Sequence, residues 1–109
     1  MMPTMRLKAV AQQLIEINRE AFTETEFNLA YHTLCAAMSC AFALNDTEAL
    51  ADIQRIAEDQ QTRIDSQHPD YEHSSVSAAK RNVPGIFHTL ALETKAKILV
   101  IKSRPYQKT

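Results

Sequence analysis

The sequence predicts a single all-α domain, folded as a four-helix bundle of the up-and-down type that is built from two αα-hairpins. Three observations favour this class. The 109 residues are enough for one hydrophobic core and too few for two. The chain has one glycine and four prolines, so it lacks the frequent turn residues of β-sandwiches and barrels. Its apolar residues recur every three or four positions, which is the spacing of amphipathic helices.

The first two helices are expected on either side of a short turn. The first helix should extend from about residue 4 to residue 21. Thr23 and Glu26 have the spacing of a capping box, which would start a second helix ending near Leu44. Apolar residues lie on two sides of this second helix, so we expect it to be the central element of the bundle.

A third helix is expected after another short turn. Asn45 and Glu48 are spaced as a second capping box, and the helix should end near Ser66. Residues 67–82 contain few large apolar side chains, which indicates a loose connection with one or two helical turns after residue 75.

The last helix is expected from Pro84, which fits a first helical turn, to about Ser103. Residues 98–101, Ile-Leu-Val-Ile, are locally typical of a strand, but the chain offers no partner strand, so helix is preferred. The C-terminal tail, 103–109, is expected to be flexible. The predicted core consists of Leu7, Val10, Leu14, Ile17, Phe27, Tyr31, Leu34, Met38, Leu50, Ile53, Ile56, Phe87, Leu90 and Ile98.

The segment from Ala41 to Ala51, followed by Ile53 and Ile56, resembles the helix–turn–helix of a tetratricopeptide repeat. Ala49, Ile53 and Ile56 match the spacing of that family's second-helix positions. The aromatic and glycine signatures of its first helix are missing, and no second copy of the pattern is present. The resemblance therefore implies a tight αα-hairpin and no more.

Composition excludes several function classes. With Gly85 as the only glycine, the chain cannot form a P-loop or a dinucleotide-binding turn. The net charge of −1 gives no general attraction to nucleic acid or to an anionic membrane. The residues up to Ile17 lack the uninterrupted apolar core of a secretory signal, so we expect none. Cys35 and Cys40 lie about 140° apart around one helix and cannot pair, which favours a reducing compartment, the cytoplasm.

No group of residues in the sequence predicts catalysis. His32, Cys35 and Ser39 share one helix edge, a position from which nucleophile and base rarely align. The segment 68–73 offers two histidines and two carboxylates but matches no closed zinc pattern. Glu58 and Asp59 lack apolar surroundings that would raise a pKa. We therefore expect no enzymatic activity, no cofactor and no metal.

Charge is unevenly distributed along the second half of the chain. Residues 46–72 carry eight acidic and two basic side chains, net −6, whereas residues 73–109 carry one acidic and seven basic side chains, net +6. The two segments either pack together through complementary faces or leave a basic segment for an acidic partner or nucleic acid. The basic segment consists of Lys95, Lys97, Lys102 and Arg104, with Lys108 beyond them.

The aliphatic run at 98–101 is the strongest functional indication. Ile98 and Ile101 can face the core, while Leu99 and Val100 point elsewhere, either beneath residues 67–82 or the N-terminus, or into a partner. The candidate interface residues are Phe87, Leu92, Leu99 and Val100. The leading hypothesis is a non-catalytic interaction or assembly module that forms homo-oligomers through its last helix or binds another protein.

Two alternatives stay open. The first is a bundle that binds a small ligand or a metal through His32, His68, His73 or His88. The second is a nucleic-acid adaptor that uses the basic segment, although only Phe87 and Tyr106 lie near it as aromatic platforms.

Overall fold

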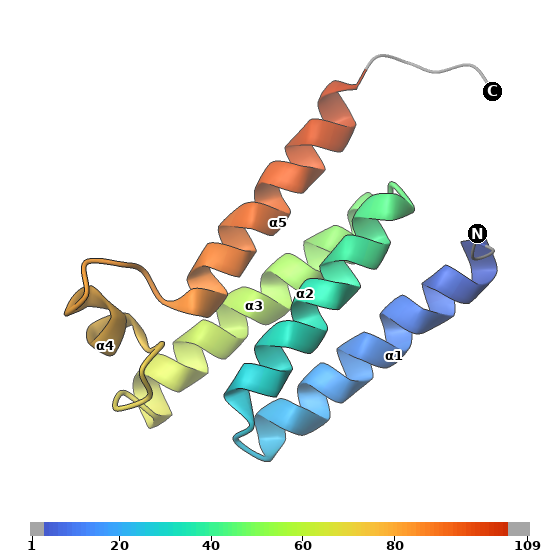
Figure 1. Ribbon diagram of the computed structural model, residues 1–109. Helices are drawn as coiled ribbons and strands as arrows, with labels where there is room; N and C mark the ends of the chain where they lie inside the picture. Colours follow the sequence, from blue (N-terminus) through green and yellow to red (C-terminus); the bar gives the residue numbers. More distant parts are fainter. Residues whose placement is uncertain (1–3, 105–109) are drawn as a thin grey trace.

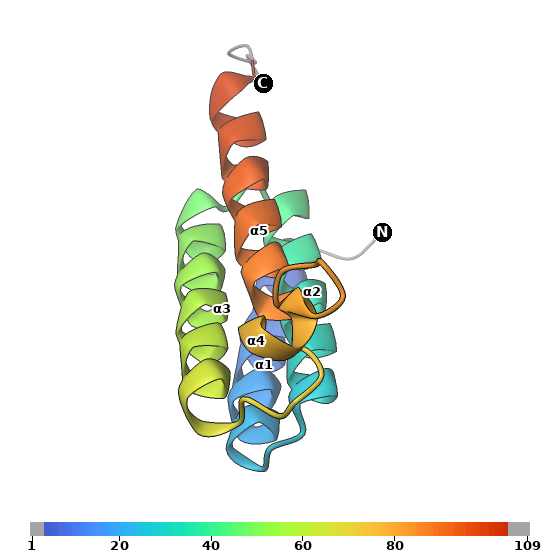
Figure 2. The same ribbon diagram turned by 90° about the vertical axis from the view of Figure 1, so that its left-hand side faces the viewer.

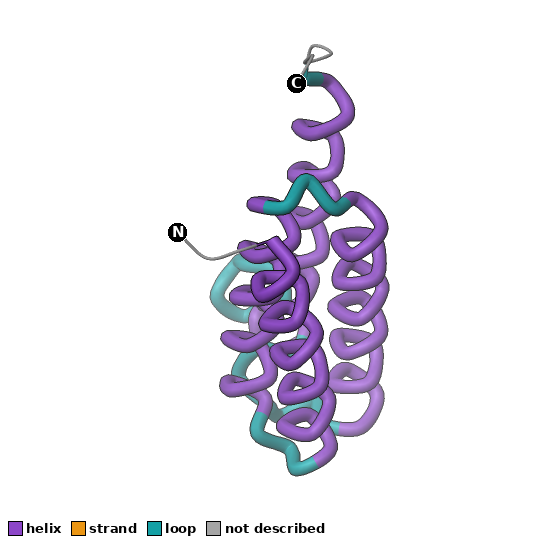
Figure 3. The backbone as a smooth tube through the Cα atoms, turned by 90° about the vertical axis from the view of Figure 1, so that its right-hand side faces the viewer, coloured by secondary structure: helices purple, strands orange, loops and turns teal. Residues whose placement is uncertain are grey.

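The computed structural model describes residues 4–104, which form five helices and no strand (Figures 1 and 3). The helices are α1 (Thr4–Thr23), α2 (Phe27–Ala43), α3 (Thr47–Gln67), α4 (Ser75–Ala79) and α5 (Ile86–Ser103). The all-α prediction is confirmed, including a helix rather than a strand at residues 98–101. None of the described helices combines the length and the apolar character needed to cross a membrane.

α2 is the central helix, as predicted, because it contacts α1, α3 and α5. The closest pairs are α1 with α2 and α3 with α5, and the molecule is elongated, 50 × 27 × 19 Å (Figures 1 and 2). Over their described lengths, α1 and α5 make no extensive contact. The specific four-helix up-and-down arrangement is therefore not confirmed, and a fifth helix is present.

Both predicted capping boxes are wrong, because each helix begins later than expected: the N-cap of α2 lies three residues after Thr23, and that of α3 lies one residue after Asn45. Thr25 and Asn45 have positive φ values, 58° and 54°, of the kind that ends a helix in the left-handed region. The N-cap of α2 is then Glu26, without a side-chain cap, and the Thr23 hydroxyl donates to the Arg19 carbonyl at 3.0 Å.

The α2–α3 turn has the same backbone form but a real side-chain cap. Asp46, not Asn45, is the N-cap of α3, and its Oδ1 accepts from the Ala49 N–H at 3.0 Å. The 6→1 hydrogen bonds of the two turns are equivalent: Glu26 N–H to Ala21 carbonyl, 2.8 Å, and Asp46 N–H to Ala41 carbonyl, 2.9 Å.

Residues 67–82 are hydrogen-bonded to the body of the protein, which corrects the predicted loose connection. Ser74 is buried and caps α4, accepting from the Ser77 N–H at 3.1 Å. The Ser75 N–H and hydroxyl donate to the Asp65 carboxylate at 2.7 and 2.6 Å. These polar contacts substitute for the large apolar side chains that the segment lacks.

α5 begins after Gly85 rather than at Pro84, which also corrects the prediction. Gly85 is the N-cap, and a Cβ at this position would overlap the side-chain amide of Gln61. Gln61 Oε1 accepts from the backbone N–H of His88 at 3.0 Å, so the glutamine satisfies the first turn of α5. Glycine is thus needed at position 85 because the Gln61 side chain lies close to the backbone there, and not because the backbone has an unusual φ.

The predicted core is right in α2, α3 and α5 and partly wrong in α1. Ile17 is 43% exposed, and Ile15, which was not predicted, is buried. The buried face of α1 includes Asn18, a polar residue that hides the true stripe in the sequence. Seven predicted core residues are buried, namely Phe27, Leu34, Met38, Leu50, Ile53, Phe87 and Leu90. Six others are half-buried, namely Leu7, Val10, Leu14, Tyr31, Ile56 and Ile98.

Candidate functional site

The outer face of α5 exposes aliphatic side chains on the side opposite to the core. Leu92 is 53% exposed, Leu99 58% and Val100 45%, whereas Leu90 and Thr94 are fully buried on the inner side of the same helix. We call Leu92, Leu99 and Val100 the outer aliphatic face. An aliphatic patch of this kind on a surface helix is typical of an interaction site.

The position of α5 explains why this face is uncovered. Its C-terminal half extends past the ends of α2 and α3 (Figures 1 and 2). Residues 67–82, one of the two segments expected to cover Leu99 and Val100, lie with α4 at the other end of the molecule (Figure 1).

Phe87 does not belong to this face. It is fully buried in one chain, with its ring 5.9 Å from Tyr31 and 6.4 Å from Phe22 in edge-on contacts. Its assignment to an interface is therefore corrected, because a side chain without exposed surface cannot contact a partner.

The structure divides the basic segment into two pairs. Lys97 Nζ lies 4.6 Å from the centroid of the Phe42 ring and the Arg104 guanidinium 5.2 Å from it. Lys95 and Lys102 are exposed and project beside the outer aliphatic face. Lys108 is outside the described residues.

The histidines are not gathered into a site. His32 and His88 are exposed, and His68 and His73 are half-buried against the rings of Phe27 and Tyr71 respectively. Residues 4–104 contain no group of three or more His, Cys, Asp or Glu side chains that could hold a metal ion.

Cys35 lacks the surroundings of an activated nucleophile. Burial raises the pKa of the Cys35 thiol, and the nearby Glu93 carboxylate acts in the same direction. Its partner is Tyr31, whose pKa is raised to about 12 by burial and by the hydrogen bond to Cys35. A reactive cysteine needs the opposite shift, toward the thiolate. Both Cys35 and Cys40 are free and half-buried.

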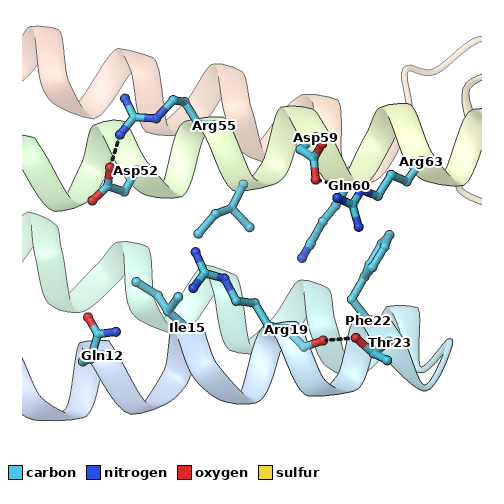
Figure 4. Close-up of a pocket in the computed structure, with 11 residues that line it drawn as sticks. Gln12, Ile15, Arg19, Phe22, Thr23, Asp52, Arg55, Asp59, Gln60 and Arg63 are labelled. Carbon is cyan, nitrogen blue, oxygen red and sulfur yellow. Dashed lines mark hydrogen bonds and ion pairs between the residues drawn. The ribbon is translucent and has the colours of Figure 1, made fainter.

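A groove of about 680 Å³ between α1 and α3 was not predicted from the sequence. Its apolar surface comes from Ile15, Phe22 and Ile56, and three arginines and two aspartates surround it (Figure 4). No local pattern could have shown this groove, because its two walls come from α1 and α3, which the whole of α2 separates in sequence.

A buried amide pair connects the two walls of this groove. Asn18 Nδ2 donates to Gln60 Oε1 at 3.1 Å, and Gln60 Nε2 donates to Asn18 Oδ1 at 2.8 Å. Asn18 Nδ2 also donates to the Ala30 carbonyl of α2 at 2.7 Å. The network fixes α1, α2 and α3 relative to one another, since each amide would be unsatisfied if the helices moved apart.

No protein-family model, no curated protein and no solved structure matches this chain, so its function is inferred from its own surfaces.

Proposed function

We propose that this protein is a non-catalytic helical assembly module that forms a homodimer through the outer aliphatic face of α5. The observation that supports the proposal is the exposure of Leu99, 58%, on a helix whose opposite side is already buried. A helix that is apolar on both sides is typically packed on both sides.

The spacing of the outer residues fits helix pairing. Leu92, Ala96, Leu99 and Ser103 follow each other at intervals of four, three and four residues, the pattern of a short coiled-coil seam. Burying such aliphatic surface is worth roughly 25 cal/mol for each Å² removed from water. Small residues at two of the four positions allow the helices to approach closely.

The charges beside the seam favour a parallel pair. Lys95 and Lys102 lie along one flank, and Glu93 and Val100 lie along the other. An antiparallel pair would bring the two lysine flanks together, whereas a parallel pair places each lysine flank against the flank that contains Glu93. Like-charge contact thus disfavours the antiparallel arrangement.

The histidine and nucleic-acid alternatives have weaker support. The histidines are dispersed, and two of the four basic side chains lie over Phe42 instead of projecting outward. The free, half-buried thiols of Cys35 and Cys40 are compatible with the proposed reducing location, the cytoplasm.

Light scattering over a hundredfold range of concentration tests the dimer. The wild-type protein should approach twice the monomer mass of 12.3 kDa as concentration rises. Leu99→Glu should remain folded by circular dichroism and stay monomeric. Leu29→Glu is the matched control, because Leu29 is 50% exposed on α2, away from the seam, and this variant should still dimerise.

Cross-linking tests the orientation of the pair. In a Cys35→Ser, Cys40→Ser background, Ser103→Cys should form an intermolecular disulfide on mild oxidation, because a parallel seam places the two thiols side by side. A wild-type protein that stays monomeric at every concentration would refute the dimer. A dimer that Leu29→Glu disrupts and Leu99→Glu does not would move the interface to α2.

A further inference from the structure

A groove of about 680 Å³ lies between α1 and α3, and no residue of the proposed dimer face lines it. The residues of α1 that line it recur from Gln12 to Thr23, and those of α3 from Asp52 to Arg63. At 1.5 Å per residue, these stretches correspond to a channel of roughly 15 Å, or about three helical turns. The groove is therefore long enough for a short partner helix.

The surface of the groove combines apolar side chains with an unbalanced charge. Arg63 Nε lies 3.0 Å from the Asp59 carboxylate, and Arg55 forms an ion pair with Asp52. Arg19 extends into the groove from the α1 side and makes no ion pair with residues 4–104 (Figure 4). The groove thus has a surplus positive charge at Arg19, and the half-buried side chains of Phe22 and Ile56 also line it.

We infer that this groove binds an amphipathic helix of another protein, with a carboxylate of that helix pairing with Arg19 and its apolar side chains packing on Phe22 and Ile56, which are half-buried. An arginine in a groove can hold a carboxylate through two parallel N–H···O bonds. Helix-in-groove recognition is a common way to use a groove that combines apolar and charged side chains.

The charge of the groove also selects among possible occupants. The outer face of α5 from a second copy has lysines on its flank and would meet Arg19 as a like charge. An acidic helix instead complements the surplus charge. This site is separate from the proposed dimer, so either proposal can fail without the other.

A displayed library of 14-residue helices tests the inference directly. Each helix has leucines on one face, with its polar positions randomised among Glu, Gln and Lys. The full-length wild-type protein should enrich Glu at the positions flanking the leucines. The Arg19→Glu variant should enrich Lys instead, because the charge that it offers is reversed. Arg6→Glu is the matched control on α1, outside the groove, and should select Glu as the wild type does.

The best acidic helix should then bind about tenfold more weakly to Arg19→Gln, the effect expected from losing one charge-assisted pair. Its binding should weaken with added salt, since Arg19 is exposed. Amide chemical-shift changes should centre on α1 and α3. The inference is overturned if no helix is enriched, if selection is indifferent to charge, if Arg6→Glu behaves as Arg19→Glu does, or if the shifts centre on α5.

Discussion

The two ends of this molecule are constructed differently. At the end that holds the α1–α2 turn and α4, which we call the capped end, polar side chains join four helices. The α2–α3 turn and the C-terminal half of α5 lie at the other end, which we call the open end (Figure 1), and there the described residues make few such contacts. The difference indicates which end completes its core within one chain.

Hydrogen bonds at the capped end converge on two side chains of α3, Gln61 and Asp65. Gln61 donates to the Asp65 carboxylate at 3.0 Å and to the His73 carbonyl at 3.3 Å while accepting from the His88 N–H. Tyr71 donates to Asn28 Oδ1 at 2.5 Å, which ties the segment before α4 to α2. Elements that are remote in sequence are therefore fixed to one another by specific geometry.

At the open end, the C-terminus of α5 is attached through long side chains. The Arg104 guanidinium donates to Asn45 Oδ1 at 2.6 Å and lies over the ring of Phe42. Exposed contacts of this type are worth little to stability. The aliphatic residues Leu99 and Val100 remain 58% and 45% exposed within the described chain. We interpret the open end as the part of the core that a second molecule completes.

The largest effect that we predict compares one side chain from each end. Phe87→Ala should lower the free energy of unfolding by about 3–5 kcal/mol, because the ring is fully buried and its loss leaves a cavity. Leu99→Ala should change it by less than about 0.5 kcal/mol when measured below the concentration of self-association. Urea denaturation followed by circular dichroism gives both values.

Equal losses in these two variants would contradict the comparison. They would mean that Leu99 is covered within a single chain, and that the open end is completed without a partner. The same experiment at high concentration is the internal control, because only there should Leu99→Ala reduce the apparent stability.

The sequence was sufficient for the helices because their apolar spacing is local. Leu34 and Met38 lie four residues apart in α2, Leu50 and Ile53 lie three apart in α3, and all four are buried as predicted. The same reasoning correctly predicted that Leu99 points away from the core of the single chain, since it cannot share a helix face with Ile98 and Ile101. The spacing of apolar residues therefore predicts the buried face of a helix reliably wherever that face is purely apolar.

Contacts between distant segments could not be predicted in this way. The pair of Asn18 and Gln60 is buried although both residues are polar, because the two amides hydrogen-bond to each other across helices distant in sequence, and Asn18 also donates to the Ala30 carbonyl. A polar residue on a buried face shifts the apparent stripe, which is why Ile17 was placed in the core instead of Ile15. The α1–α3 groove depends on this pair and was missed for the same reason.

The second prediction compares the two turns, which share a backbone form but differ in the residue at positive φ. Thr25, at the capped end, is β-branched and has φ 58°, which is unfavourable, whereas Asn45, at the open end, tolerates φ 54°. Thr25→Gly should raise the free energy of unfolding by about 1 kcal/mol. Asn45→Gly should change it by less than about 0.5 kcal/mol.

Thermal unfolding of the two variants beside the wild type measures this difference. An equal gain at both turns would show that relief of the positive φ itself, and not the added strain of a β-branched residue, determines the effect. A loss at Thr25 would show instead that the hydrogen bond from its hydroxyl to the Glu24 carbonyl, 2.6 Å, outweighs that strain.

The smallest effect concerns acid and is specific to the capped end. Burial alone would raise the pKa of Asp65, but the hydrogen bonds from Ser75 and Gln61 outweigh it, so the pKa lies below its ordinary value of 3.8. The folded state therefore gains stability from ionised Asp65 above about pH 4, and that gain disappears as pH falls through the lowered pKa.

Asp65→Asn should remove this component, so that the stability of the variant falls less steeply than that of the wild type below about pH 4. Asp70→Asn, at an exposed carboxylate of the same segment, should leave the steepness of the wild type intact. Urea midpoints measured from pH 2.5 to 7 separate the two variants. If both substitutions reduce the loss of stability below about pH 4 equally, general charge repulsion determines the acid sensitivity. The hydrogen bonds around Asp65 would then not distinguish the capped end from the open end.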